Sequence, residues 1–148
     1  METVLAVSTP GIYRAFRAVY GFLSVQFAAP AASYMVAPEV TYRTLDQVNR
    51  LLGGGPYPAE QSQMWHMLAV GNVATLSFMC ALLFWDLRRF YPVLPALLFL
   101  KGFSALYSLG LGATGSPPIF LGVFVLDGVT CLAMWFFATR AHRALHQR

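Results

Sequence analysis

The chain has 148 residues, which fits a single domain, and its composition is that of a membrane protein. Hydrophobic residues make up 57% of it and charged residues only 11%, against about 25% charged residues in soluble proteins, and the mean hydropathy is +0.57. The formal net charge of +4 does not indicate a nucleic-acid partner, because the arginines gather at the ends of apolar runs rather than on one surface. The composition therefore excludes an ordinary soluble domain.

Three apolar runs, 64–85, 93–112 and 119–138, are each long enough to cross about 30 Å of hydrocarbon. A fourth run, 13–36, is weaker because it carries Arg14, Arg17, Gln26 and Pro30. Helices satisfy their backbone hydrogen bonds internally, as a lipid environment requires. The sequence predicts an all-α integral membrane protein: a four-helix transmembrane bundle forming one domain, 1–148, with helices at about 13–36, 63–86, 93–112 and 118–140.

The first run has an alternative interpretation. Its arginines, its apolar core and the small residues at 28–33 also resemble a signal peptide with a cleavage site. We interpret 13–36 as a first helix that is not cleaved.

The arginines predict the orientation. Arg14 and Arg17 lie at the start of the first helix, Arg88 and Arg89 lie between the second and third, and further arginines follow the fourth. Cytoplasmic segments are enriched in Lys and Arg, so both termini and the 86–92 connection are predicted to be cytoplasmic. The segments 100–102 (Leu-Lys-Gly) and 126–128 (Leu-Asp-Gly) resemble those of small bacterial four-helix membrane proteins, which implies a bacterial inner membrane.

The extracytoplasmic loop 37–62 is predicted to contain a short amphipathic interfacial helix. Thr44 and Gln47 have the spacing of a capping box, so the helix is expected to begin there. Leu45, Val48, Leu51 and Leu52 then form one apolar face, and the glycines 53–55 end the helix. Such a helix lies on the bilayer surface or over the end of the bundle, either as a lid or as a packed connector.

Each predicted helix carries one strongly polar residue near its middle. These residues are Gln26, Asn72, Lys101 and Asp127, each about 12 to 18 Å from a helix end at 1.5 Å per residue. A charge at the centre of a membrane helix costs about 2.5 to 3.5 kcal/mol even on lenient insertion scales. We therefore predict a buried Lys101–Asp127 salt bridge, with Asn72 and Gln26 supplying further hydrogen bonds in the same polar core.

The purpose of this pair is open at this point. It locks the third helix to the fourth, or it forms the polar floor of a ligand cavity or a proton path, or it pairs with another subunit. Ala105 and Ser108 share the helix face of Lys101, and small residues at 104, 108 and 112 allow close helix packing.

Two further residues are candidates for an interfacial contact. Trp65 and His66 open the second helix at the outer interface. His66 is interpreted either as an ordinary interfacial residue or as a contact for a quinone or another substrate. Cys80 and Cys131 form no C-x-x-C motif and are interpreted as packing residues. We predict no metal site and no cofactor.

The sequence contains no nucleotide-binding loop and no Ser/His/Asp set, and a single histidine in the spans cannot supply bis-histidine haem ligation. The leading hypothesis is a non-enzymatic membrane protein, either an accessory subunit of a larger membrane complex or a binder of a hydrophobic small molecule. In it Lys101 contacts an anion or carbonyl, and Asp127 is its charge partner. The alternative is a proton-coupled small transporter or a membrane-embedded enzyme acting on a lipid-like substrate through Asp127 and Lys101.

Overall fold

The computed structural model describes residues 11–57 and 63–146, and every element in these ranges is a helix. The elements are α1 (Gly11–Val36), α2 (Pro38–Leu51), α3 (Gln63–Trp85), α4 (Leu87–Phe90), the 3-10 helix η1 (Tyr91–Val93), α5 (Leu94–Ala113) and α6 (Ile119–His146). The four predicted long helices correspond to α1, α3, α5 and α6. The all-α prediction is confirmed for the residues that the structure describes.

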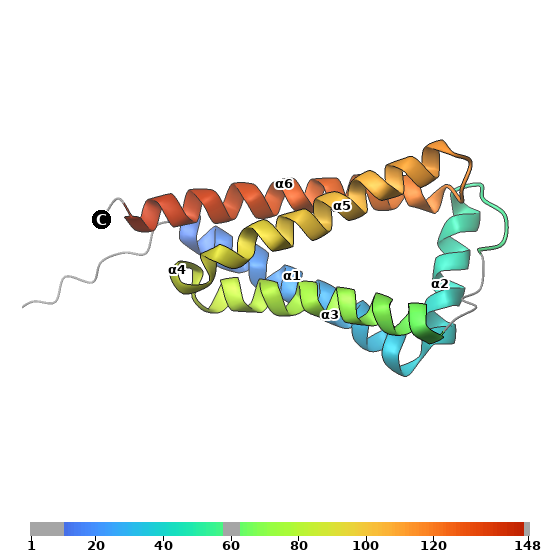
Figure 1. Cartoon of the computed structure of the whole chain (residues 1–148), viewed down its shortest axis with the longest axis horizontal. Coiled ribbons are helices and arrows are strands. Elements are labelled where there is room, and N and C mark those ends of the chain that lie inside the picture. The colour runs from blue at the N-terminus through green and yellow to red at the C-terminus, as the bar shows by residue number, and fades with distance from the viewer. Residues whose placement is uncertain (1–10, 58–62, 147–148) are drawn as a thin grey trace, which may run out of the picture.

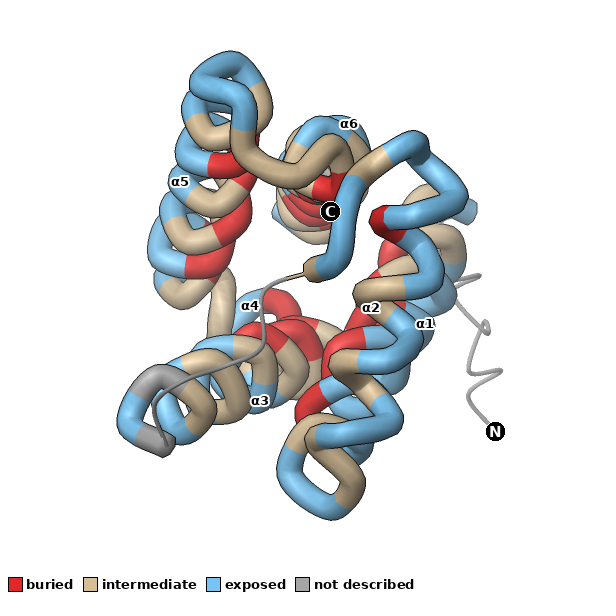
Figure 2. Tube along the Cα trace, turned by 90° about the vertical axis from the view of Figure 1, so that its right-hand side faces the viewer, coloured by how far each residue is buried: buried red, intermediate tan, exposed pale blue. Residues whose placement is uncertain are grey.

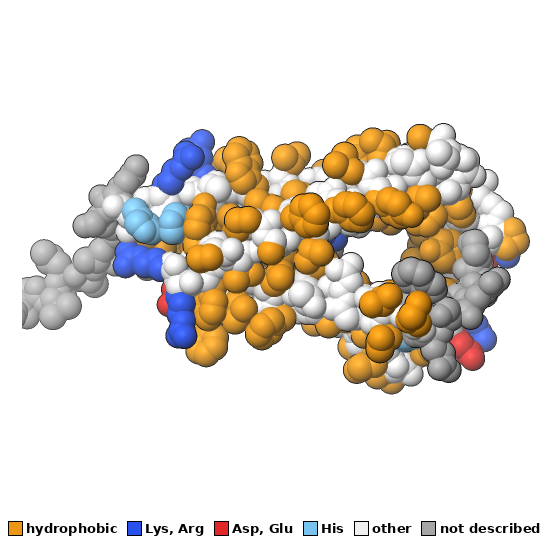
Figure 3. All heavy atoms as spheres, viewed as in Figure 1, with side chains coloured by type: hydrophobic (Ala, Val, Ile, Leu, Met, Phe, Trp, Pro, Cys, Tyr) orange, Lys and Arg blue, Asp and Glu red, His pale blue; other side chains and the backbone are white. Residues whose placement is uncertain are grey.

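Three stretches of the described chain are long and apolar enough to cross a membrane, namely His66–Trp85, Leu87–Ala113 and Ile119–His146. They indicate a membrane protein. Figure 3 agrees with this, since hydrophobic side chains cover the sides of the long helices and basic side chains gather at the end where α6 finishes. α1 has 26 residues but is not among the three stretches.

The long helices form two pairs that meet at one end of the molecule and diverge toward the other (Figure 1). α1 packs along α3, α5 packs along α6, and α1 also packs against α6. Although a short connection joins α3 to α5, the two helices touch little and lie close only beside α4 and η1.

α2 lies across the wide end, near the start of α6 (Figure 1). Seen from this end, the buried residues of the long helices lie mainly on faces turned toward the centre of the molecule (Figure 2). α2 therefore covers the wide end of the bundle like a roof, and the main hydrophobic core lies at the narrow end.

The core at the narrow end draws residues from all four long helices and from α4. Its largest fully buried side chains include Phe16, Tyr20, Leu83, Leu87, Leu97 and Met134. The Tyr20 hydroxyl donates a hydrogen bond to the Met134 carbonyl (3.0 Å), which joins α1 to α6. Because an unpaired buried hydroxyl is costly, this bond fixes how α1 and α6 face each other.

α1 and α3 are joined by a reciprocal pair of hydrogen bonds. The Ser24 hydroxyl donates to the Ser77 carbonyl (3.3 Å), and the Ser77 hydroxyl donates to the Ser24 carbonyl (2.7 Å). A Cβ at Gly21 would lie 3.1 Å from the Phe84 ring, so the absence of a side chain there allows close packing.

The predicted start of the short amphipathic helix is wrong. α2 begins at Pro38, since proline suits the first turn of a helix, where its missing N–H is not needed. Thr44 is therefore inside the helix and donates to the Val40 carbonyl (2.9 Å) instead of capping it. α2 ends at Leu51, just before the glycines 53–55 that were predicted to end it. Gly53 has the left-handed conformation (φ +83°) that favours glycine.

Candidate functional site

The buried Lys101–Asp127 salt bridge predicted from the sequence is present. Lys101 lies on α5 and Asp127 on α6, and the Lys101 Nζ donates to the Asp127 Oδ1 at 2.5 Å. Lys101 is 7% exposed and Asp127 9%. Ala105 and Ser108 are buried on the same face of α5, as predicted. These small side chains allow α5 to pack closely against α6 next to the pair.

α1 completes the surroundings of the pair with an aromatic ring. The Lys101 Nζ lies 4.7 Å from the centroid of the Phe27 ring, and Phe27 is itself buried. The negative face of an aromatic ring attracts a cation, more strongly where water is excluded. Three helices therefore meet at the Lys101 ammonium, which has one ionic and one aromatic partner.

Gln26 and Asn72 do not belong to this polar core. Both side chains are exposed, Gln26 on α1 and Asn72 on α3, whereas the pair is buried. Gln26 directly precedes Phe27, and on a helix adjacent residues point about 100° apart, so only Phe27 faces the pair. The prediction that these two amides extend the hydrogen bonding of the pair is wrong.

His66 lies at the wide end, where its ring stacks on that of Tyr34 with centroids 4.5 Å apart and an interplanar angle of 16°. The Tyr34 hydroxyl is in turn 2.7 Å from the Tyr42 hydroxyl of α2. His66 thus belongs to an aromatic contact between α1, α2 and α3. Trp65 lies on α3, and its side chain is outside the described residues.

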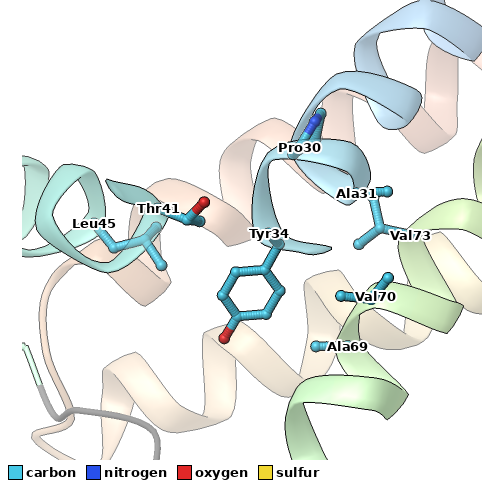
Figure 4. A pocket seen from close by; sticks show the side chains of 8 residues that line it. All are labelled: Pro30, Ala31, Tyr34, Thr41, Leu45, Ala69, Val70 and Val73. Carbon is cyan, nitrogen blue, oxygen red and sulfur yellow. The ribbon is translucent and has the colours of Figure 1, made fainter. Parts of the chain in front are cut away.

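A cavity of about 300 Å³ lies behind this aromatic contact. Figure 4 shows that its wall comes from three helices, with Tyr34 from α1 extending between α2 and α3. Its lining residues are Pro30, Ala31, Tyr34, Thr41, Leu45, Ala69, Val70 and Val73. The lining is almost entirely apolar, with the hydroxyl-bearing side chains of Tyr34 and Thr41 as the exceptions.

The cavity and the ion pair lie on the same face of α1. Phe27, which covers Lys101, and Ala31, which lines the cavity, are one helical turn apart and are both buried. Lys101 and Asp127 are not among the residues that line the cavity. The pair lies near the middle of α5 and about one third of the way along α6 from Ile119.

Asn49 anchors α2 to the start of α6, and the sequence analysis did not identify this residue. It is fully buried; its Nδ2 donates to the Gly55 carbonyl (2.8 Å), and its Oδ1 accepts from the backbone N–H of Ile119, the first residue of α6 (3.3 Å). A Cβ at Gly54 would collide with the Asn49 side chain. Asn49 lies on the apolar face that Leu45 and Leu52 define, and a polar residue on that face was the available signal.

Asp46 fixes the segment that follows α2. Its Oδ1 accepts from the Tyr57 backbone N–H (2.8 Å), and its Oδ2 accepts from Arg50 Nε (2.8 Å). These hydrogen bonds, that from Tyr57 first, lower the pKa of the Asp46 carboxyl below its ordinary value. The charged form of Asp46 therefore stabilises the chain reversal after α2.

In the described residues, no three His, Cys, Asp or Glu side chains come together to hold a metal ion. The candidate site consists of an apolar cavity at the wide end and a buried ion pair one turn of α1 further along. Comparison with protein-family models, with curated proteins and with solved structures finds no match for the chain.

Proposed function

We propose that this protein is a non-enzymatic four-helix membrane protein that binds a hydrophobic, lipid-like small molecule between α1, α2 and α3. The apolar cavity of about 300 Å³ carries this proposal. Ligand sites are concave, mostly apolar and about 300 to 1,000 Å³ in volume, with a few polar groups that orient the ligand. Tyr34 and Thr41 are such groups here.

The proposal includes α1 as a fourth transmembrane helix. Support comes from its packing along α3, which is itself a candidate span, and from its 26-residue length. Arg14 and Arg17 lie in the first turns of α1, which begins at the narrow end where α6 finishes (Figure 1), and the last turns of α6 also carry arginines. By the positive-inside bias this end is cytoplasmic, with both termini, in a bacterial inner membrane, and α2 lies at the opposite interface.

The ion pair gives the proposed site a polar floor. Ala31 lines the cavity one turn from Phe27, whose ring lies against the Lys101 ammonium, so a ligand that extends beyond the cavity along α1 approaches the pair. Lys101 then contacts a carbonyl or anionic group of the ligand, and Asp127 remains as the charge partner that keeps the ammonium tolerable in the membrane.

Filling the cavity tests the proposal. Val70→Trp places an indole in the cavity, whereas Val129→Trp places one on the exposed side of α6, away from it. We expect native mass spectrometry of gently extracted protein to show a small-molecule adduct on wild type and on Val129→Trp, and its loss from Val70→Trp. An adduct retained by Val70→Trp, or absent from wild type, contradicts the proposal.

The same mass spectra test the accessory-subunit candidate, and a transport assay tests the other. Additional mass from a second polypeptide identifies an accessory subunit. A proton-coupled transporter or a membrane enzyme instead requires Asp127 as proton carrier, because it is the buried acid of the described core. That alternative predicts pH-dependent activity in proteoliposomes that Asp127→Asn abolishes while the protein still folds.

A further inference from the structure

The narrow end of the molecule contains a second cavity with a different chemistry. It measures about 420 Å³, lies between the start of α1 and the end of α6, and is lined by Ile12, Phe136, Arg140, Arg143 and Ala144. It is far along the bundle from the ligand cavity under α2. Two of its lining residues are arginines and three are apolar, so it does not suit the ligand proposed above.

Its two arginines are available for an anion. Neither Arg140 nor Arg143 has a carboxylate within salt-bridge distance in the part of the chain that the structure describes, and both are exposed. The Arg140 guanidinium lies over the Phe136 ring, 5.4 Å from its centroid, which holds it at the cavity without neutralising it. Guanidinium groups bind phosphate oxygens through paired charge-assisted hydrogen bonds.

Position along α6 indicates where these arginines meet a bilayer. Arg140 lies about 32 Å along the helix from Ile119, at 1.5 Å per residue, which is about the thickness of the hydrocarbon core. The arginines therefore reach the level of lipid phosphates, while Phe136, one turn earlier, remains beside the acyl chains. Basic recesses between membrane helices at the cytoplasmic side are where anionic headgroups bind.

We infer that the α1–α6 cavity binds the phosphodiester of an anionic glycerophospholipid from the cytoplasmic leaflet. Arg140 and Arg143 contact the phosphate oxygens, and Ile12 and Phe136 contact the first carbons of an acyl chain. The inference rests on the membrane crossing of α6 and on the proposed orientation, but not on the ligand of the cavity under α2, so loss of that ligand leaves it intact.

Lipid adducts on the full chain test this inference. The purified protein in detergent receives equal amounts of phosphatidylglycerol and phosphatidylcholine, and native mass spectrometry counts each adduct. We expect a preference for phosphatidylglycerol on wild type, reduced at least tenfold in Arg140→Gln/Arg143→Gln, because the loss of a single charge-assisted hydrogen bond already corresponds to about tenfold and this variant loses the contacts of both arginines.

A matched variant controls for net charge. Arg17→Gln/Arg89→Gln also removes two positive charges from this end, but these guanidiniums lie over the Phe84 and Phe90 rings, outside the cavity. It should retain the wild-type preference. Equal loss in both double variants shows a diffuse charge effect, and an unchanged preference in Arg140→Gln/Arg143→Gln shows that the cavity is not the site; either result overturns the inference.

Inorganic phosphate separates a lipid from a soluble anion. A lipid held by both its phosphate and its chain is not displaced by millimolar phosphate, and Phe136→Ser weakens it while the arginines remain. Displacement of phosphatidylglycerol by phosphate, with no effect of Phe136→Ser, identifies an anion site without lipid specificity and overturns the inference. Circular dichroism of each variant confirms that the helices are intact.

Discussion

Lys101 and Asp127 are each costly in the middle of a membrane helix, and each makes the other tolerable. Their contact leaves neither charge facing lipid, and Phe27 closes the side of the ammonium that Asp127 does not cover. Removing one partner leaves an uncompensated charge, whereas replacing both by uncharged groups of similar volume does not. The energetic signature of the pair is therefore a strong coupling between the two positions.

We predict that Lys101→Met alone destabilises the protein by about 3 to 5 kcal/mol, because it strands the Asp127 carboxylate. The double variant Lys101→Met/Asp127→Asn should be less destabilised than Lys101→Met. Unfolding in mixed detergent micelles, followed by circular dichroism, measures both values. Additive effects of the two substitutions, with no coupling energy, contradict the ion pair as a stabilising contact.

The sequence predicted how far along its helix each polar residue lies, but not which side of the helix it is on. Counting residues from helix ends located Lys101 and Asp127 at matching heights, and their charge required that they face each other. Gln26 and Asn72 lie at similar heights, yet both are exposed and neither contacts the buried pair. In a helix whose lipid-facing side is as apolar as its core, periodicity does not identify the buried face, and an amide tolerates exposure better than a charge.

Among the elements, α2 differs most from its prediction, and the reason is local. Pro38 starts the helix one and a half turns before Thr44, and a proline at the first turn outweighs a capping box further on. Its end was predicted within two residues, because consecutive glycines favour helix termination. Its anchorage through Asn49 depends on the distant start of α6, which no local pattern reports.

The α2 roof should loosen in acid. Because the folded-state pKa of Asp46 is lowered, its contribution is complete above the ordinary carboxyl pKa of about 3.9 and is lost as pH falls through the lower, folded-state value. We predict that the Tyr57 amide, which donates to Asp46, loses protection against hydrogen exchange in that range, after correction for the intrinsic pH dependence.

Two variants check this assignment. Asp46→Asn should remove the acid-induced change, since the amide does not titrate. Glu39→Gln alters an exposed carboxylate of the same helix, 3.9 Å from Arg43, and should leave the change as in wild type. A Tyr57 amide whose protection does not vary with pH in wild type contradicts the role given to Asp46.

At the scale of the whole molecule, the proposed topology has α1 crossing the membrane. Single cysteines at Gly11, Gln47, Thr114 and Arg143 probe the two ends, and a side chain at Gly11 meets open space. We predict that a membrane-impermeant maleimide labels Gln47→Cys and Thr114→Cys in intact cells, and Gly11→Cys and Arg143→Cys only after permeabilisation.

The native thiols give little background in this experiment, because Cys80 is buried and Cys131 partly buried within the spans. Labelling of both Gly11→Cys and Gln47→Cys from outside would mean that the two ends of α1 lie on the same side, so that α1 does not cross the membrane. The three apolar stretches would then be the complete set of crossings within the described chain, and the four-helix topology would be wrong.

The divergence of the two helix pairs gives the molecule unequal cross-sections. Its α2 end is wide and its other end, tied by Tyr20 and Met134, is narrow. Embedded in a bilayer, such a wedge displaces more lipid area from one leaflet than from the other. Lateral pressure in the leaflet beside α2 therefore opposes the separation of the two helix pairs. The free energy of folding then depends on the spontaneous curvature of the surrounding lipid.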